Sequence, residues 1–291
     1  MTLTVRAIAE RLTDDATSLR LTLLILLLRP PAPGAVRGLT WLVAGLAIAV
    51  PGLARSAWTW LALAALVFAR LVQDWPLSDN HIYLLGYWCL GLGLCLLVPA
   101  PMGVIGAMSR WLVGAVFLCA ILWKAVLTPD FLDARFFRLT LITDERFADV
   151  SLGIGGLTQA QLDSNRAALA ALPEGAELID GPVLYEPPAL QRVGLALTWG
   201  GFVMESLLAA AFLSPWPAAL HRRRHLVLLA FTTLTYAVAP VAGFGWLLAA
   251  MGFAQCSPSQ QTLRLGYLAA FVLVLVYSET PLVRLVLTGA S

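Results

Sequence analysis

The stretch MSRWLVGAVFLCAILWKAVLTPD, residues 108–130, is apolar for most of its length and turns polar at its end. Residues 108–127 match the length that a transmembrane helix needs, about 20 mostly apolar residues. Lys124, close to the polar end, is the only lysine of the chain. The stretch therefore predicts a membrane helix that carries a single ionisable amine near one membrane face.

The composition of the whole chain agrees with a membrane environment. Of its 291 residues, 59% are hydrophobic and 12% are charged, and the mean hydropathy is +0.81. A soluble domain is about half apolar and about a quarter charged. The net charge of +2 comes with scattered arginines, which excludes a nucleic-acid-binding protein. We expect an all-α fold, a polytopic helical membrane protein whose partner is the lipid bilayer.

Hydropathy predicts about seven membrane helices, with six to eight as the range. The candidate spans are 37–54, 57–73, 81–98, 108–127, 190–213, 225–254 and 263–287. Residues 19–28 are apolar but too short to assign as a span. The sixth candidate is too long for one straight helix, and Pro240, Gly243 and Gly245 predict a kink or a break inside it.

Basic residues predict the orientation and the domain organisation. The cluster HRRRH at 221–225 is expected on the cytoplasmic side of an inner membrane, which places the polar loop region 128–189 on the external side. Within that region, a helix is expected to begin after Thr158 and to stop before Pro173. The remaining segments are an amphipathic N-terminal segment (1–18) and two groups of membrane helices (19–127 and 190–291).

Lys124 has two interpretations. An ionisable side chain at the centre of a membrane helix costs about 2.5–3.5 kcal/mol on insertion scales. Lys124 escapes this cost if its flexible stem lifts the amine to the interface. A lysine that stays desolvated can instead lose its proton, which an arginine cannot do, and can serve as a base.

His81 is expected in the first turn of a membrane helix, after the potential capping residues Ser78, Asp79 and Asn80. It is either a neutral hydrogen-bond donor or a histidine of the interfacial aromatic belt. The predicted orientation places His81 and Lys124 near the same external membrane face. Together they would frame a site that is open to lipid.

Glu205 is expected in the cytoplasmic half of its span, paired with a hydroxyl, a tyrosine or an arginine of a neighbouring helix. A place in a proton pathway is the alternative. The four cysteines form no CxxC motif and no cluster with histidine, so neither a disulfide framework nor a metal site is predicted. Sequence motifs of hydrolases, nucleotide-binding proteins and zinc peptidases are missing.

Two motifs resemble the horizontally transferred transmembrane family, which includes the vitamin K-dependent gamma-carboxylases. These are DNHIYLLGYW, with Asn80 and His81, and ILWKAVLTPDFLDARFF, with Lys124 and Asp130. The resemblance implies that Lys124, assisted by His81, deprotonates a reduced quinone so that oxygen can attack. The chain has one lysine where the carboxylase motif has an adjacent pair, and it lacks the large lumenal region that holds protein substrates.

Three functions follow as hypotheses. The first is a membrane enzyme that acts on a quinone-like or lipid substrate, with Lys124 as base and His81 as its partner. The residues expected to support that site are Asp79, Asn80, Asp130 and Glu205. The second is a non-catalytic membrane protein that assists the maturation of a protein partner, whose identity the sequence does not give. The third is a proton-coupled transporter that uses Glu205.

Overall fold

The fold was described from a computed structural model of the chain. The structure describes residues 14–31, 34–75, 78–171, 181, 183–238 and 241–279. Contacts divide the chain into two compact units. Unit 1 comprises residues 1–116, 208–236 and 240–291, and unit 2 comprises residues 117–207 and 237–239. The expected surface helix at 1–18 falls mostly outside the described residues, and its last two residues open the first described helix.

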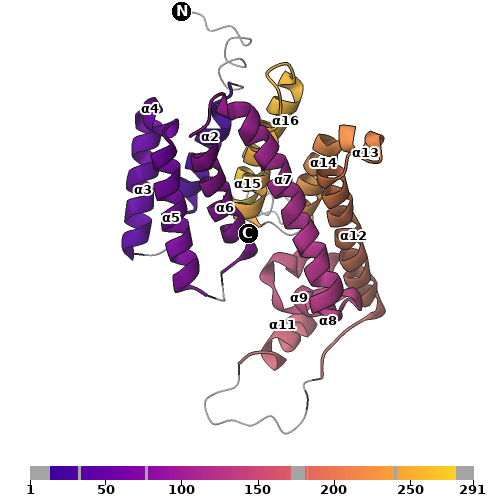
Figure 1. Ribbon diagram of the computed structural model, residues 1–291. Helices are drawn as coiled ribbons and strands as arrows, with labels where there is room; N and C mark the ends of the chain where they lie inside the picture. The colour runs from indigo at the N-terminus through magenta and orange to yellow at the C-terminus, as the bar shows by residue number, and fades with distance from the viewer. Residues whose placement is uncertain are drawn as a thin grey trace, which may run out of the picture. The chain divides into compact units, whose positions relative to one another are not determined.

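All regular structure in the described residues is helical, which confirms the all-α prediction (Figure 1). The helices of unit 1 are α2 (Thr17–Leu28), α3 (Gly34–Ala49), α4 (Pro51–Ala54), α5 (Ala57–Gln73), α6 (Asn80–Cys95), the first part of α7 (Pro101–Leu122), the last part of α12 (Pro188–Leu213), α13 (Ala218–Arg222), α14 (Arg224–Val238), α15 (Ala242–Ala254) and α16 (Gln261–Glu279).

Helix α15 is the core of unit 1. Every side chain from Trp246 to Met251 is at most 1% exposed, and α15 packs against α2, α6 and α16. A helix that is apolar on all sides and only 13 residues long is typical of a buried core element rather than of a lipid-facing span. Ser109 on α7 donates a hydrogen bond of 2.6 Å to the Met251 carbonyl oxygen, which ties α7 to this core.

The candidate span 225–254 is not a single span. It consists of α14 and α15, and the outer ends of the two helices, at Arg224 and Ala254, line the same cavity. The chain therefore turns back between the helices instead of continuing in one direction. The turn is held where the Tyr236 hydroxyl accepts a hydrogen bond from the Gly245 backbone N–H. Gly245 has to be glycine because a Cβ there would overlap the Tyr236 ring.

Unit 2 contains the end of α7, the π-helix η1 (Trp123–Leu127) and most of the polar region. Its further elements are α8 (Pro129–Leu132), α9 (Arg135–Thr143), the 3-10 helix η2 (Glu145–Phe147), α10 (Ala148–Gly153), α11 (Gln159–Ala168) and the larger part of α12. These short helices enclose a small apolar core formed by Leu141, Ile142, Phe147, Leu157, Leu162 and Leu190. The predicted cap is confirmed, because Thr158 and Gln161 form a reciprocal capping box at the start of α11.

Two helices are long and apolar enough to cross a membrane: residues 101–127, which join α7 to η1, and α12. The remaining apolar helices of the described residues are shorter, 10–17 residues by the same measure. At a rise of about 1.5 Å per residue, they reach about 15–26 Å, less than the hydrocarbon thickness of about 30 Å. In the described residues, helices lie where the candidate spans predict them, except that 37–54 and 225–254 each form two helices, and the number of spans stays a prediction.

Candidate functional site

Lys124 lies in the π-helical turn η1, which continues α7 at its C-terminal end. A π-turn widens the backbone spiral, since each carbonyl bonds the N–H five residues ahead, and such turns occur frequently at functional sites. The Lys124 side chain is 23% exposed, so most of its length is covered by protein. The turn ends at Thr128, where the chain leaves the helical conformation ahead of α8.

Glu205 on α12 is the partner of Lys124 within unit 2. The ammonium nitrogen Nζ lies 2.6 Å from Oε1 and 2.6 Å from Oε2, so the amine donates to both carboxylate oxygens. The Glu205 side chain is 14% exposed. Contacts this short between oppositely charged groups form a charge-assisted pair, which is about twice as strong as a neutral hydrogen bond. The pair cancels two charges that would each be costly in an apolar setting.

The ring of Phe131 covers a further face of the ammonium. Nζ lies 4.8 Å from the ring centroid, within the range of about 6 Å for a cation–π contact. Phe131 is 4% exposed and packs against Phe136 and Phe137 on α9. The short helix α8 therefore folds back over the lysine, which leaves the amine between a carboxylate and an aromatic cluster.

The expected partner of Glu205 was wrong, whereas its depth in a membrane stays a prediction. Its partner is Lys124 rather than a hydroxyl, a tyrosine or an arginine. The first turns of α12 pack on the polar region of unit 2, where Leu190 belongs to the apolar core and Gly194 lies against Arg138.

Asp130 lies beside the pair in sequence but faces solvent. Its side chain is 56% exposed and forms an ion pair of 2.6 Å with Arg135, which also binds Asp133. Backbone and side-chain hydrogen bonds from Arg135 hold the pKa of the Asp133 carboxyl below its usual range. The structure assigns Asp130 to this surface network and records no contact of Asp130 with Lys124 or Glu205 among the residues it describes.

The other three predicted site residues belong to unit 1. Helix α6 begins at Asn80, within one residue of the predicted start at His81, and Asp79 occupies the N-cap position. The Asp79 side chain makes no capping hydrogen bond, contrary to the expectation, and Ser78 Oγ has no partner within the described part of the chain. The first turn of α6 is therefore not held by side-chain caps.

His81 lies against α15 and lines a small cavity with Arg29 and Gly243. A Cβ at Gly243 would come within 2.8 Å of the imidazole, so the glycine permits the two helices to approach. The cavity has a volume of about 20 Å³, room for no more than a single water molecule. His81 and Lys124 fall in different units, so their joint site stays a prediction.

Two features of the sequence were not recognised as parts of a site. Phe131 lies in the next helix after Lys124, and its role depends on α8 folding back. Three arginines distant in sequence, Arg110, Arg224 and Arg264, line one cavity of unit 1. In the sequence, basic residues near helix ends indicate only the orientation of the helices.

No protein-family model, no characterised protein sequence and no solved structure matches this chain, so the family resemblance rests on its two motifs alone.

Proposed function

We propose that the protein is a polytopic integral membrane protein of the cytoplasmic membrane. Support comes from the two long apolar helices and from large apolar side chains that face outward. On α12, an outward stripe is formed by Leu195, Trp199, Val203 and Leu207, spaced one turn apart. Continuous exposed apolar surface of this kind is rare on soluble proteins and suits contact with lipid.

The orientation rests on positive charge. His221–His225 contains three arginines and is placed on the cytoplasmic side by the positive-inside rule. Helix α7 begins at Pro101, and η1 continues it to Leu127. The combined helix is long enough to reach the opposite face of the membrane. Lys124 then lies near the external face, and the helices α8 to α11 lie outside the membrane.

The chemical function we assign to this protein is acid–base catalysis by the Lys124–Glu205 pair on a lipid-soluble, quinone-like substrate. The observation that carries the assignment is the bidentate pair, which is partly covered and close to an aromatic cluster. In a medium of low polarity, desolvation disfavours both charged groups, so the ammonium can pass its proton to the carboxylate and give a neutral amine and a carboxylic acid. The neutral amine can then accept one proton from a substrate, which leaves an ammonium beside a carboxylic acid.

The substrate class follows from the site and from the family resemblance. The hydroxyl of a hydroquinone would give its proton to the pair, and the resulting aryloxide would lie beside the Lys124 ammonium, which stabilises the new negative charge. The aromatic cluster of Phe131, Phe136 and Phe137 offers a surface against which a planar ring can stack. The aryloxide then passes two electrons and the proton of its second hydroxyl to oxygen, and the pair returns the first proton, so one hydroquinone and one oxygen yield one quinone and one hydrogen peroxide.

The test is the oxygen-dependent oxidation of a reduced naphthoquinone by the full-length protein in nanodiscs. Quinone absorbance and hydrogen peroxide are measured together. Lys124→Arg keeps the positive charge but cannot lose its proton, so it should lower the rate about a hundredfold. Arg135→Gln, which removes a surface charge of the same unit, should leave the rate unchanged. Equal rates for Lys124→Arg and the unmodified protein would refute the assignment.

A non-catalytic function is the second candidate, and the same pair is the observation that favours it. The pair joins the turn η1 to α12. In a non-catalytic protein, its whole role would be to hold these two elements together. In that case, Lys124→Arg retains the ion pair and full function, the unmodified protein does not accelerate hydroquinone oxidation, and only variants that break the pair impair folding. The two candidates thus differ in the outcome of one substitution.

A further inference from the structure

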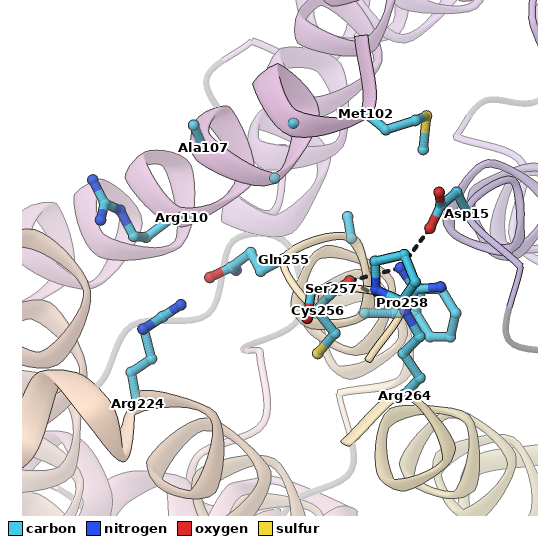
Figure 2. A pocket seen from close by; sticks show the side chains of 14 residues that line it. Asp15, Met102, Ala107, Arg110, Arg224, Gln255, Cys256, Ser257, Pro258 and Arg264 are labelled. Atoms are coloured by element: carbon cyan, nitrogen blue, oxygen red, sulfur yellow. Dashed lines mark hydrogen bonds and ion pairs between the residues drawn. The ribbon is translucent and has the colours of Figure 1, made fainter. Parts of the chain in front are cut away.

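A cavity in the described part of the chain lies in unit 1 and not at the Lys124–Glu205 pair. It has a volume of about 440 Å³ and lies where α7, α14 and α16 begin and α15 ends (Figure 2). Its ionisable lining comprises Arg110, Arg224, Arg264 and Asp15. Three positive charges against one negative charge give this hollow an excess of positive charge.

Arg264 forms an ion pair with Asp15, the one carboxylate that the described residues contribute to the lining of the cavity. Its Nη2 lies 2.5 Å from Asp15 Oδ1 and 2.7 Å from the Cys256 carbonyl oxygen. The guanidinium also covers the ring of Phe253, and the residue is 5% exposed. Arg264 is therefore a fixed part of the wall, and Asp15 is already engaged by it.

Arg110 and Arg224 carry the unbalanced charge. Each is half-buried, and the Nε of each is buried without a hydrogen-bond partner in the portion of the chain that the structure describes. Arg224 donates only from Nη1, to the His221 carbonyl oxygen at 3.2 Å, and Arg110 contacts the ring of Trp111. Both residues line the same cavity, so their positive charges repel one another. A buried donor left without an acceptor costs about 1–3 kcal/mol, so an anion here would relieve both costs.

Gln255 places a hydrogen-bond acceptor in the same hollow. In Figure 2, its side chain lies between those of Arg110 and Arg224. The amide nitrogen donates to Ser109 Oγ and to the Met251 carbonyl oxygen, whereas Oε1 has no partner among the described residues. The site thus offers two cationic donors and one neutral acceptor. That combination matches a phosphate group that carries negative oxygens and a neighbouring hydroxyl.

We propose that this cavity binds a phosphate group, either that of an anionic phospholipid headgroup or that of a soluble phosphate, between Arg110 and Arg224. Guanidinium groups bind phosphate through paired charge-assisted hydrogen bonds. The cavity lies at the end of unit 1 that carries the basic cluster His221–His225, where an anionic headgroup would meet the protein. This inference stands apart from the proposed chemistry of Lys124.

The test uses the purified full chain, with native mass spectrometry and thermal unfolding as readouts. The probes are phosphatidylglycerol, with phosphatidylcholine as the zwitterionic comparison, and inorganic phosphate. Arg110→Gln and Arg224→Gln should each weaken binding about tenfold. Arg222→Gln is the matched control, because Arg222 belongs to the same basic cluster, is exposed and does not line the cavity.

A second variant tests the space rather than the charge. Gly103 lines the cavity, and a Cβ there would meet no atom within 4 Å. Gly103→Leu should therefore fold normally, keep every charge and still prevent binding. Retention of phosphatidylglycerol alone assigns the site to a lipid headgroup, retention of inorganic phosphate alone assigns it to a soluble phosphate, and retention of both supports the shared chemistry. Binding of neither, or equal weakening by Arg222→Gln and Arg224→Gln, overturns the proposal.

Discussion

The Lys124 ammonium donates to both carboxylate oxygens of Glu205 at 2.6 Å, although the two residues are 81 positions apart in the chain. The chain's single lysine thus meets a carboxylate on one of its two longest apolar helices. Because each charge neutralises the other, both can be retained where neither would be tolerated alone.

Replacing one partner of the Lys124–Glu205 ion pair should destabilise the protein more than replacing both partners. Lys124→Met leaves Glu205 as a covered carboxylate without its cation and should lower the free energy of unfolding by about 2 kcal/mol. The double variant Lys124→Met with Glu205→Leu should recover most of that loss. Unfolding in mixed micelles gives the coupling between the two positions as a double-mutant cycle. A coupling near zero would show that the two side chains do not interact.

A methyl group at Gly252 should disturb the core of unit 1. The Cβ would overlap the ring of Tyr267, a buried residue of α16 whose hydroxyl lies 2.9 Å from His225 Nδ1. Overpacking of this kind costs about 1–3 kcal/mol. Gly45→Ala in α3 is the control, because a Cβ there meets no atom within 4 Å and alanine favours a helix over glycine. Equal unfolding temperatures for the two variants would contradict the packing of α15 against α16.

The capping box of α11 should stabilise the polar region locally. Thr158→Ala removes the hydroxyl that accepts from the Gln161 backbone N–H and should cost about 1 kcal/mol. Hydrogen exchange of residues 159–168 reports the loss directly. Thr143→Ala, whose hydroxyl only bonds back to the Leu139 carbonyl oxygen on an exposed turn, should have a smaller effect. Unchanged exchange in α11 of the Thr158 variant would show that the cap contributes nothing.

The turn around η2 should weaken in acid. A side-chain hydrogen bond from Arg146 holds the pKa of the Asp144 carboxyl below its ordinary value of 3.8. A carboxylate whose pKa is lowered in the folded protein stabilises it at neutral pH, and this contribution is lost as the pH falls below about 3.8 through the folded-state pKa. The carboxyl carbon shift of Asp144, followed against pH by NMR, measures the pKa. In Arg146→Gln the titration should move up, and an unmoved titration would assign the effect to another group.

Much of the fold followed from hydropathy, because apolar stretches bounded by polar residues form helices wherever the backbone must satisfy its own hydrogen bonds. Residues 57–73 were predicted and observed with the same bounds, and α6 begins within one residue of its expected start. The direction of the chain was harder to predict. Residues 225–254 are as apolar as a long span, yet they turn back on themselves so that α15 is buried in unit 1.

Only one of the two partners in the candidate site could be predicted. The sequence indicated Lys124, since a lone lysine in an apolar helix has a free-energy cost of insertion into a membrane. Its partner was not indicated, because the contact joins positions 81 apart in the chain and depends on how α12 packs against η1 within unit 2. The arginine cavity depends on α7, α14 and α16 beginning at one end of unit 1, a tertiary relationship that charge counting does not contain.

The central claim is that the substrate gives a proton to the Lys124–Glu205 pair. Infrared spectroscopy tests it most directly. Infrared difference spectra are recorded on the protein in nanodiscs before and after a reduced naphthoquinone is added without oxygen. If the pair takes up the substrate proton, the spectra contain the carbonyl band of a protonated carboxylic acid, which disappears in Glu205→Gln and persists in the control Glu186→Gln. A spectrum in which the hydroquinone binds and no such band appears, or in which the band survives Glu205→Gln, would contradict the claim.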